Sequence, residues 1–139
     1  MRIFAFLAPV SLAMSLALGA CSGDDGGDCD PDLIDTACTP QYEPTWDNIF
    51  ANTITPNCAP PGTACHASEG NRAGLTLEDI DESFSRLKGA AIVDGDACAS
   101  QLAFRVTSVS PIVQMPPGAP LDAGEQCAII QWIEDGAQR

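Results

Sequence analysis

The chain has 139 residues and a mass of 14.5 kDa, a length that predicts one small domain. Its 19 acidic and 6 basic side chains give a formal net charge of −13. This charge argues against nucleic-acid binding, because phosphates are contacted by Lys and Arg. A nucleophilic triad would have to use the single histidine, His66. With no further general base in a recognisable motif, we expect no catalytic residues and no enzymatic activity.

Residues 1–20 have the composition of a secretory signal peptide, with a basic start, an uncharged apolar run and small residues at the end. The junction Leu18-Gly19-Ala20-Cys21 resembles the lipobox of bacterial lipoproteins. The resemblance implies cleavage before Cys21 and membrane anchoring through acyl chains such as palmitate on that residue. Ser22, in place of aspartate, indicates the outer membrane of the cell envelope. An ordinary signal peptide that ends by chance in a cysteine is the alternative.

Residues 21–42 are expected to form an acidic, disordered tether before a folded domain at 43–139. The segment 22–35 holds six aspartates and three glycines, too little apolar surface to fold alone. Export favours a disulfide between Cys29 and Cys38 at the end of this tether. A calcium site is a lesser alternative, with the carboxylates of Asp24, Asp25, Asp28, Asp30 and Asp32 as its ligands.

The first expected helix begins after Thr45, a residue type favoured at the N-cap, and Pro56 is expected to end it. Its apolar face is formed by Trp46, Ile49, Phe50 and Ile54. Residues 57–74 contain three glycines, two prolines and two cysteines, a composition that predicts a loop.

A second helix is expected after Thr76-x-x-Asp79, which has the spacing of a capping box. Arg86 and Lys88 fall in its last turn and Gly89 follows, as is typical of a helix C-terminus. The buried stripe of this helix is expected to consist of Ile80, Phe84 and Leu87.

A third helix is expected over 100–109, and a loop with four prolines and Met115 follows at 110–120. Asp122 is expected to cap a terminal helix. The apolar side chains of these two helices are Leu102, Val106, Cys127, Ile129, Ile130, Trp132 and Ile133. No long alternation of apolar and polar residues and no repeat of 20–50 residues is present. The sequence therefore predicts an all-α domain of three to four short helices with long loops.

The segment Cys58-Ala-Pro-Pro-Gly-Thr-Ala-Cys65-His66 carries the chemistry of the chain. Two cysteines followed directly by a histidine are the pattern of c-type haem attachment, in which both thiols bond to the porphyrin and the imidazole binds the iron. The usual pattern has two residues between the cysteines, and this chain has six. The extra residues must bulge away from the ring, and Pro60-Pro61-Gly62 is a turn sequence that allows this.

Met115 supports the same interpretation. After loss of the signal peptide, His66 and Met115 are the one histidine and one methionine of the chain. Only this pair could therefore form a His/Met-ligated iron. Pro116-Pro117-Gly118 follows as a stiff, helix-free segment. A lone methionine is otherwise most often an apolar filler.

Residues 46–139 resemble a cytochrome c domain, in particular the divergent domains of envelope lipoproteins of myxobacterial and planctomycete type, in which the cysteines are often further apart. The segments that carry the resemblance are Ile54–Cys58, Cys65-His66, Ala73–Leu77, Gln114–Gly118, Leu121 and Ile130–Ala137. It implies covalent haem c between the cysteine loop and the methionine loop. It also implies an N-terminal helix near Phe50 that crosses a C-terminal helix near Trp132, and a role in electron transfer.

The cysteine count leaves two readings open. Besides Cys21, the chain has Cys29, Cys38, Cys58, Cys65, Cys98 and Cys127. If Cys58 and Cys65 hold haem, the other four can pair as Cys29–Cys38 and Cys98–Cys127, and we favour the latter bridge over other pairings. Without haem, Cys58–Cys65 becomes a third disulfide. A zinc site on these cysteines and His66 is disfavoured, because exported cysteines oxidise and the spacing matches no zinc finger.

The leading prediction is thus a lipid-anchored, single-haem electron carrier, in which Arg72 and Arg105 could pair with haem propionates. Its acidic surface favours a basic redox partner protein. The alternative is a haem-free, disulfide-stapled structural or interaction lipoprotein with a degenerate cytochrome c fold.

Overall fold

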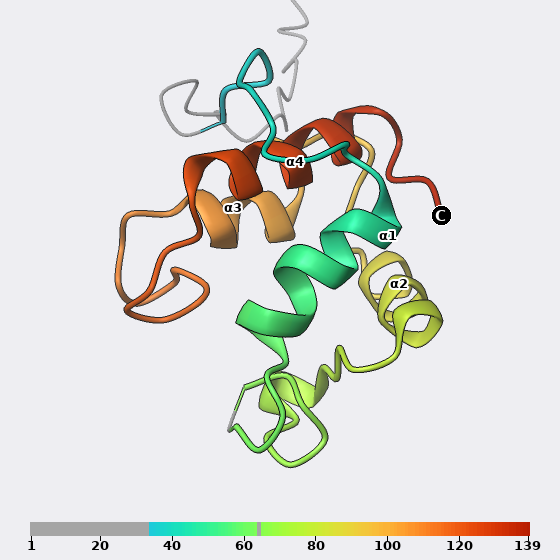
Figure 1. The fold of residues 1–139 in the computed structure, drawn as a ribbon, viewed down its shortest axis with the longest axis vertical. Coiled ribbons are helices and arrows are strands. Elements are labelled where there is room, and N and C mark those ends of the chain that lie inside the picture. Colours follow the sequence, from blue (N-terminus) through green and yellow to red (C-terminus); the bar gives the residue numbers. More distant parts are fainter. Residues whose placement is uncertain (1–33, 64) are drawn as a thin grey trace, which may run out of the picture.

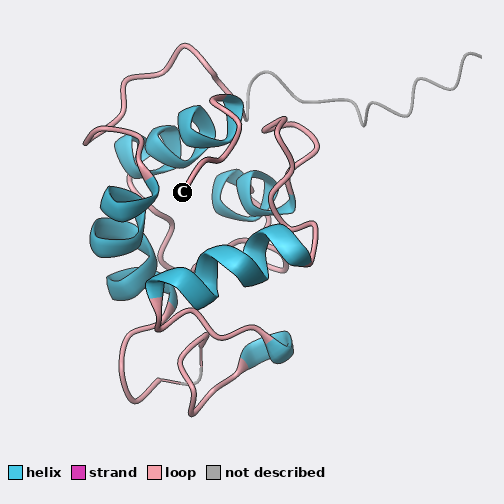
Figure 2. Ribbon diagram, turned by 90° about the vertical axis from the view of Figure 1, so that its right-hand side faces the viewer, coloured by secondary structure: helices cyan, strands magenta, loops and turns pink. Residues whose placement is uncertain are grey.

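The computed structural model describes residues 34–63 and 65–139, and this part of the chain is all-helical, as predicted (Figure 1). Its α-helices are α1 (Trp46–Ile49), α2 (Ile80–Gly89), α3 (Gln101–Thr107) and α4 (Ala123–Glu134). A π-helix, η1 (Phe50–Cys58), continues α1, and a 3₁₀ turn, η2 (Arg72–Gly74), lies before α2. Figure 2 shows these helices joined by long loops, with no strand in the described residues.

The predicted signal peptide, Cys21, Cys29 and the tether up to residue 33 lie outside the described residues. Among the helices that the structure describes, none is long and apolar enough to cross a membrane.

Three predicted helix starts are confirmed by side-chain caps. The Thr45 hydroxyl accepts from the Asn48 amide, and the Ser100 hydroxyl accepts from the Ala103 amide. Asp122 and Glu125 form a reciprocal capping box at the start of α4. Each of these side chains satisfies an amide that has no partner within its own helix.

Two predicted boundaries differ from the structure. The cap of α2 is Asp79 rather than Thr76, because the Asp79 carboxylate accepts from the amides of Asp81 and Glu82. The third helix ends at Thr107 rather than Val109, since Ser108 has an extended backbone with ψ 134°.

The prediction that Pro56 ends the first helix is wrong. The chain stays helical to Cys58, with Pro56 inside η1. Proline has no amide hydrogen for an α-helical bond to the fourth residue before it. Wider π-helical winding hydrogen-bonds each amide to the fifth residue before it. The Ala59 amide donates to the Ile54 carbonyl in this way at 3.1 Å. Cys58 is thereby the last residue of a continuous helical segment that begins at Trp46.

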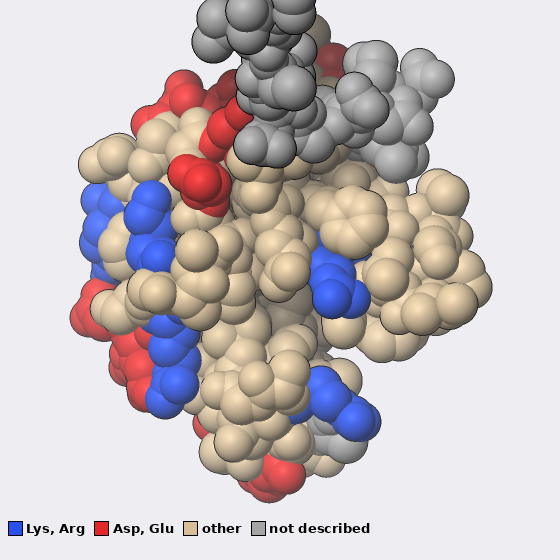
Figure 3. Space-filling model, turned by 180° about the vertical axis from the view of Figure 1, so that it is seen from behind, with Lys and Arg blue, Asp and Glu red and all other residues tan. Residues whose placement is uncertain are grey.

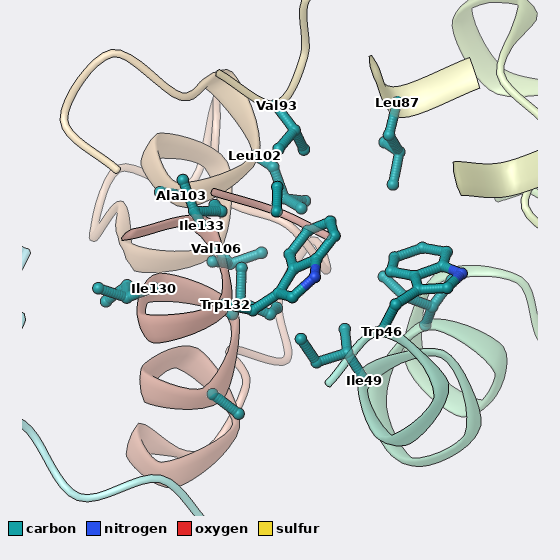
Figure 4. Close-up of a cluster of buried hydrophobic side chains, with 14 of the residues drawn as sticks. Trp46, Ile49, Leu87, Val93, Leu102, Ala103, Val106, Ile130, Trp132 and Ile133 are labelled. Atoms are coloured by element: carbon teal, nitrogen blue, oxygen red, sulfur yellow. The ribbon is translucent and has the colours of Figure 1, made fainter. Parts of the chain in front are cut away.

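The core lies where α1, α2 and α4 meet. Figure 4 shows Trp46 of α1 and Trp132 of α4 side by side, with ring centroids 5.2 Å apart. Both rings are almost fully buried, and their indole nitrogens donate to the carbonyls of Ile80 and Gln138. Phe84 of α2 packs on both rings at 5.7 and 6.4 Å. The expected contact between the first helix and the last is confirmed.

Residues 34–42, here called the strap, belong to the predicted tether but are bonded to α4. A disulfide joins Cys38 to Cys127, and the Gln131 side chain donates to the Cys38 carbonyl at 2.8 Å. The Gln41 amide donates to the Gly124 carbonyl at 3.0 Å. Gly124 is needed there, because a Cβ atom on it would lie 2.8 Å from the Gln41 Cβ.

This disulfide corrects both predicted pairings. Cys127 is bonded to Cys38, so the predicted Cys29–Cys38 and Cys98–Cys127 bridges are wrong. The strap brings the Cα atoms of Cys38 and Cys127 to 5.8 Å although 89 residues separate them in sequence, a distance suited to a disulfide. Cys98 is also disulfide-bonded.

Candidate functional site

A backbone hydrogen bond closes the loop between the two motif cysteines. The His66 amide donates to the Cys58 carbonyl at 3.0 Å, so the start and the end of the motif lie together. The loop leaves η1 through a turn in which the Thr63 hydroxyl donates to the Pro60 carbonyl at 2.7 Å. Gly62 has φ 73° in this turn, a backbone conformation that favours glycine. The chain thus turns away after Cys58, and His66 lies back beside it.

The His66 imidazole is held in one tautomer. Its Nδ1 lies 3.0 Å from the Leu75 carbonyl oxygen, and because a carbonyl can only accept, Nδ1 carries the proton. Nε2 then keeps its lone pair, and no hydrogen bond from a described residue engages it. The His66 carbonyl in turn accepts from the Leu77 amide at 2.8 Å. A histidine oriented by a carbonyl on one ring nitrogen is the usual arrangement of a metal ligand.

Cys58 and Cys65 are both half-buried free thiols. They are close enough for the charge of one to act on the other. Burial raises the pKa of Cys58, the neighbouring Cys65 and Glu125 add to the rise, and together they bring it to about 12. Cys58 is therefore protonated at neutral pH. The Cys58–Cys65 disulfide expected for a haem-free protein is not formed, whereas Cys38, Cys98 and Cys127 are all disulfide-bonded.

Met115 lies in the helix-free segment between α3 and α4, as predicted. The Met115 amide donates to the Arg105 carbonyl at 2.8 Å, which fastens the loop to α3. The Met115 side chain is half-buried. No hydrogen bond within the described part of the chain joins Met115 to the Cys58–His66 segment. The sequence-predicted site residues thus fall into two groups, with Cys58, Cys65 and His66 gathered in one loop and Met115 in another.

The molecule is hollowed on the face shown in Figure 3, with Lys and Arg side chains at its borders. An open groove of about 320 Å³ lies between the segment that holds His66 and the end of α2. Its lining residues are Ala73, Gly74, Leu75, Arg86, Gly89, Ala90 and Ile92. In the described residues, no group of three or more His, Cys, Asp and Glu side chains is arranged to hold a metal ion by itself.

Sequence reasoning missed a polar cluster beside Cys58, here called the Glu125 cluster and formed by Tyr42, Thr53, Asn57 and Glu125. The Thr53 hydroxyl and the Asn57 side-chain amide donate to Glu125 Oε1 at 3.0 and 3.1 Å. Tyr42 hydrogen-bonds to Thr53, and burial raises the pKa of the Tyr42 phenol, with Glu125 adding to the rise. The capping-box spacing Asp122-x-x-Glu125 was the available signal, but it indicates only the bond from the Asp122 amide to Glu125 Oε2.

Comparison with known proteins gives one family match. Residues 63–118 match the family described as planctomycete cytochrome C. The matched segment includes Cys65, His66 and Met115, covers less than half of the chain and begins after Cys58. No curated protein and no solved structure matches the chain. The match supports a cytochrome c-like domain. The lipoprotein type, and the use of the widely spaced cysteines as a divergent haem-attachment motif, stay predictions.

Proposed function

We propose that this protein is a membrane-anchored, c-type cytochrome-like electron carrier that holds one haem c through Cys58 and Cys65, with His66 and Met115 as iron ligands. The observation that carries the proposal is the His66 imidazole. Its Nδ1 is fixed on the Leu75 carbonyl at 3.0 Å, while two unbonded thiols lie in the same closed loop.

The donor set fits covalent haem. Each attachment needs a free thiol, and Cys58 and Cys65 are the two free cysteines among the described residues. Each thiol would add across a vinyl C=C bond: sulfur bonds to one carbon, and the thiol hydrogen goes to the other. The addition needs no oxidant and releases no leaving group. His66 would present Nε2 to the iron, because Nδ1 is already protonated and hydrogen-bonded.

A bound haem iron supplies a one-electron redox couple, and the chain's own residues would orient the group and limit its exposure to water. Met115 is proposed as the second ligand, and a methionine raises the reduction potential relative to a second histidine. The Met115 loop is anchored on α3 through the Arg105 carbonyl. Its residues 108–120 contain no charged side chain, which suits a surface beside an apolar porphyrin.

We further propose that acyl chains on Cys21 anchor the protein in the bacterial envelope, at the outer membrane, and that it transfers electrons rather than catalysing a reaction. The net charge of −13 favours a basic redox partner. Their association should weaken as salt increases, because screening reduces the attraction between opposite charges.

An absorption spectrum tests the proposal. The full chain is expressed in an exporting host with cytochrome c maturation, and spectra are taken oxidised, reduced and in alkaline pyridine. We expect haem that is covalently retained after denaturation and sharp reduced bands. Met115→Ala should keep the covalent haem and lose the methionine-dependent band.

A colourless protein would overturn the proposal if a control cytochrome matures in the same cells. If that protein also had no free thiols, the disulfide-stapled structural lipoprotein would be the better account.

A further inference from the structure

We propose that Glu125 is a positioning residue for haem attachment, acting through Thr53 and Asn57 to hold Cys58 in place for its thioether independently of Cys65. This inference rests on the proposed function. Glu125 touches neither thiol through a hydrogen bond and acts through the helical turn that ends at Cys58.

The Glu125 cluster joins three separate parts of the chain. Glu125 Oε1 accepts from Thr53 at 3.0 Å and from Asn57 at 3.1 Å, so two positions of η1 are fixed on one oxygen of α4. Thr53 is fully buried. Tyr42 of the strap covers it by a hydrogen bond to its hydroxyl. The two bonds from Thr53 and Asn57 to Glu125 are here called the clamp. Asn57 directly precedes Cys58, so the clamp ends one residue before the attachment point.

The two thiols are held in different ways. Cys65 follows the turn at Pro60–Thr63, and its carbonyl accepts from the Arg72 amide at 3.1 Å. None of the bonds of the Glu125 cluster involves Cys65 or His66. The His66 amide also donates to the Cys58 carbonyl, so loosening the clamp should free the Cys58 side chain more than it moves Cys65, which keeps its own bond to the Arg72 amide.

A carboxylate suits the clamp because both of its oxygens accept. Oε1 takes the two donors from η1, and Oε2 takes the Asp122 amide at 3.2 Å. A glutamine of the same size has only one accepting oxygen and would turn an NH₂ group toward one of these donor sets. Glu125→Gln therefore breaks either the clamp or the cap without changing the volume of the side chain.

The test compares haem attachment in four variants of the full chain. Glu125→Gln and Asn57→Ala weaken the clamp. Asp122→Ala removes the side-chain half of the helix cap but leaves the Asp122 amide, Thr53 and Asn57 on Glu125. Asn52→Ala is the control within η1, because the Asn52 side chain is exposed and donates only to the Asn48 carbonyl. Peptide mass spectrometry identifies which cysteine carries haem, and the alkaline pyridine spectrum distinguishes one thioether from two.

We expect haem on both cysteines in the unchanged chain and in the controls. In Glu125→Gln and Asn57→Ala, we expect a several-fold increase in protein with haem on Cys65 alone and a free Cys58 thiol. Full double attachment in both clamp variants would overturn the inference. Equal loss of all haem in the clamp variants and in Asp122→Ala would also overturn it, since the role would then be stability alone.

A second measurement separates this inference from the proposed function. Amide hydrogen exchange of residues 54–59 reports on the end of η1 with or without haem. If the unchanged chain binds no haem, the proposed function fails, and the clamp is judged by exchange. Faster exchange of this segment in Glu125→Gln than in Asp122→Ala would support the clamp, and equal exchange would overturn it.

Discussion

The two loops that carry the proposed iron ligands differ in how firmly they are attached. In Figure 1 the loop after η1 lies at the lower end of the molecule, and the loop before α4 lies at the left side of the molecule. In the first, His66 donates to the carbonyls of Cys58 and Leu75 and accepts from the Leu77 amide. The second is fastened through Met115 and Arg105, and it leaves Val109 and Ile112 at 82% and 89% exposure.

This difference indicates that the loop with His66 is the more firmly organised of the two in the chain itself. Under the proposed function, the loop with Met115 would gain contacts when haem binds. An iron-ligating side chain that is already held in place loses little conformational freedom on binding. A loosely attached one must be ordered, and the entropy cost of this ordering offsets part of the free energy of its contacts. We therefore expect His66 to determine whether haem is retained and Met115 to determine its potential.

The largest expected effect is on haem content. His66→Ala should remove nearly all covalent haem, because the motif then lacks its proximal ligand, while Met115→Ala should retain it. Haem content is measured from the alkaline pyridine spectrum per mole of protein. Ser68→Ala is the matched control, since the Ser68 side chain is exposed and bonds only to Glu69. Equal losses in His66→Ala and Met115→Ala would contradict the comparison.

The next effect is on thiol reactivity in protein made without haem. Because burial raises the pKa of Cys58 to about 12, alkylation at pH 8 should be slower by about a thousandfold than in the urea-unfolded chain. The rate in the folded protein should rise with pH up to about 12, where the Cys58 thiol ionises. Peptide mass spectrometry measures modification of Cys58, and a rate equal to that of the unfolded chain would show an unburied thiol.

The pKa of Cys58 also has a consequence for stability. The unfolded chain loses this proton at the lower pH, so its ionisation favours unfolding under alkaline conditions. The free energy of unfolding of the haem-free protein should fall as the pH rises from 9.0, the ordinary pKa of the thiol, through about 12. Cys58→Ser should reduce this dependence.

Truncation of an apolar side chain to alanine should lower the free energy of unfolding by different amounts in the two loops. Leu77 is 3% exposed and donates its amide to the His66 carbonyl, whereas Ile112 is 89% exposed. Leu77→Ala should lower the free energy of unfolding by about 2–5 kcal/mol, and Ile112→Ala by less than about 0.5 kcal/mol. Urea denaturation of protein made without haem gives both values. A comparable loss in Ile112→Ala would mean that the methionine loop is packed as firmly as the histidine loop.

The last of these effects concerns the strap. Replacing Cys38 and Cys127 together by serine should cost about 2–4 kcal/mol of unfolding free energy, because the bridge no longer restricts the unfolded chain. Urea denaturation again measures the loss. If the Glu125 cluster also depends on the strap, the double variant should in addition speed hydrogen exchange at residues 54–59. An unchanged exchange rate would show that Glu125 fixes η1 without Tyr42.

The sequence predicted those features that depend on neighbouring residues. Thr45 and Asp122 were identified as caps because a cap is a local interaction. The π-helical passage through Pro56 was not predicted, since proline ordinarily ends a helix. The Cys38–Cys127 bridge could not be derived, because disulfide connectivity depends on which segments meet in space. The contacts from Glu125 to Thr53 and Asn57 were missed for the same reason.

The bond from the His66 amide to the Cys58 carbonyl has a consequence for protein engineering. It makes the segment between the two motif cysteines a side loop whose base is closed independently of its length. Lengthening such a loop costs only about 0.6 kcal/mol per doubling. The turn at Gly62 is exposed, and no atom lies within 4 Å of a Cβ built there. Short peptides or affinity tags inserted at this turn should therefore be tolerated, and would be displayed beside the proposed haem site.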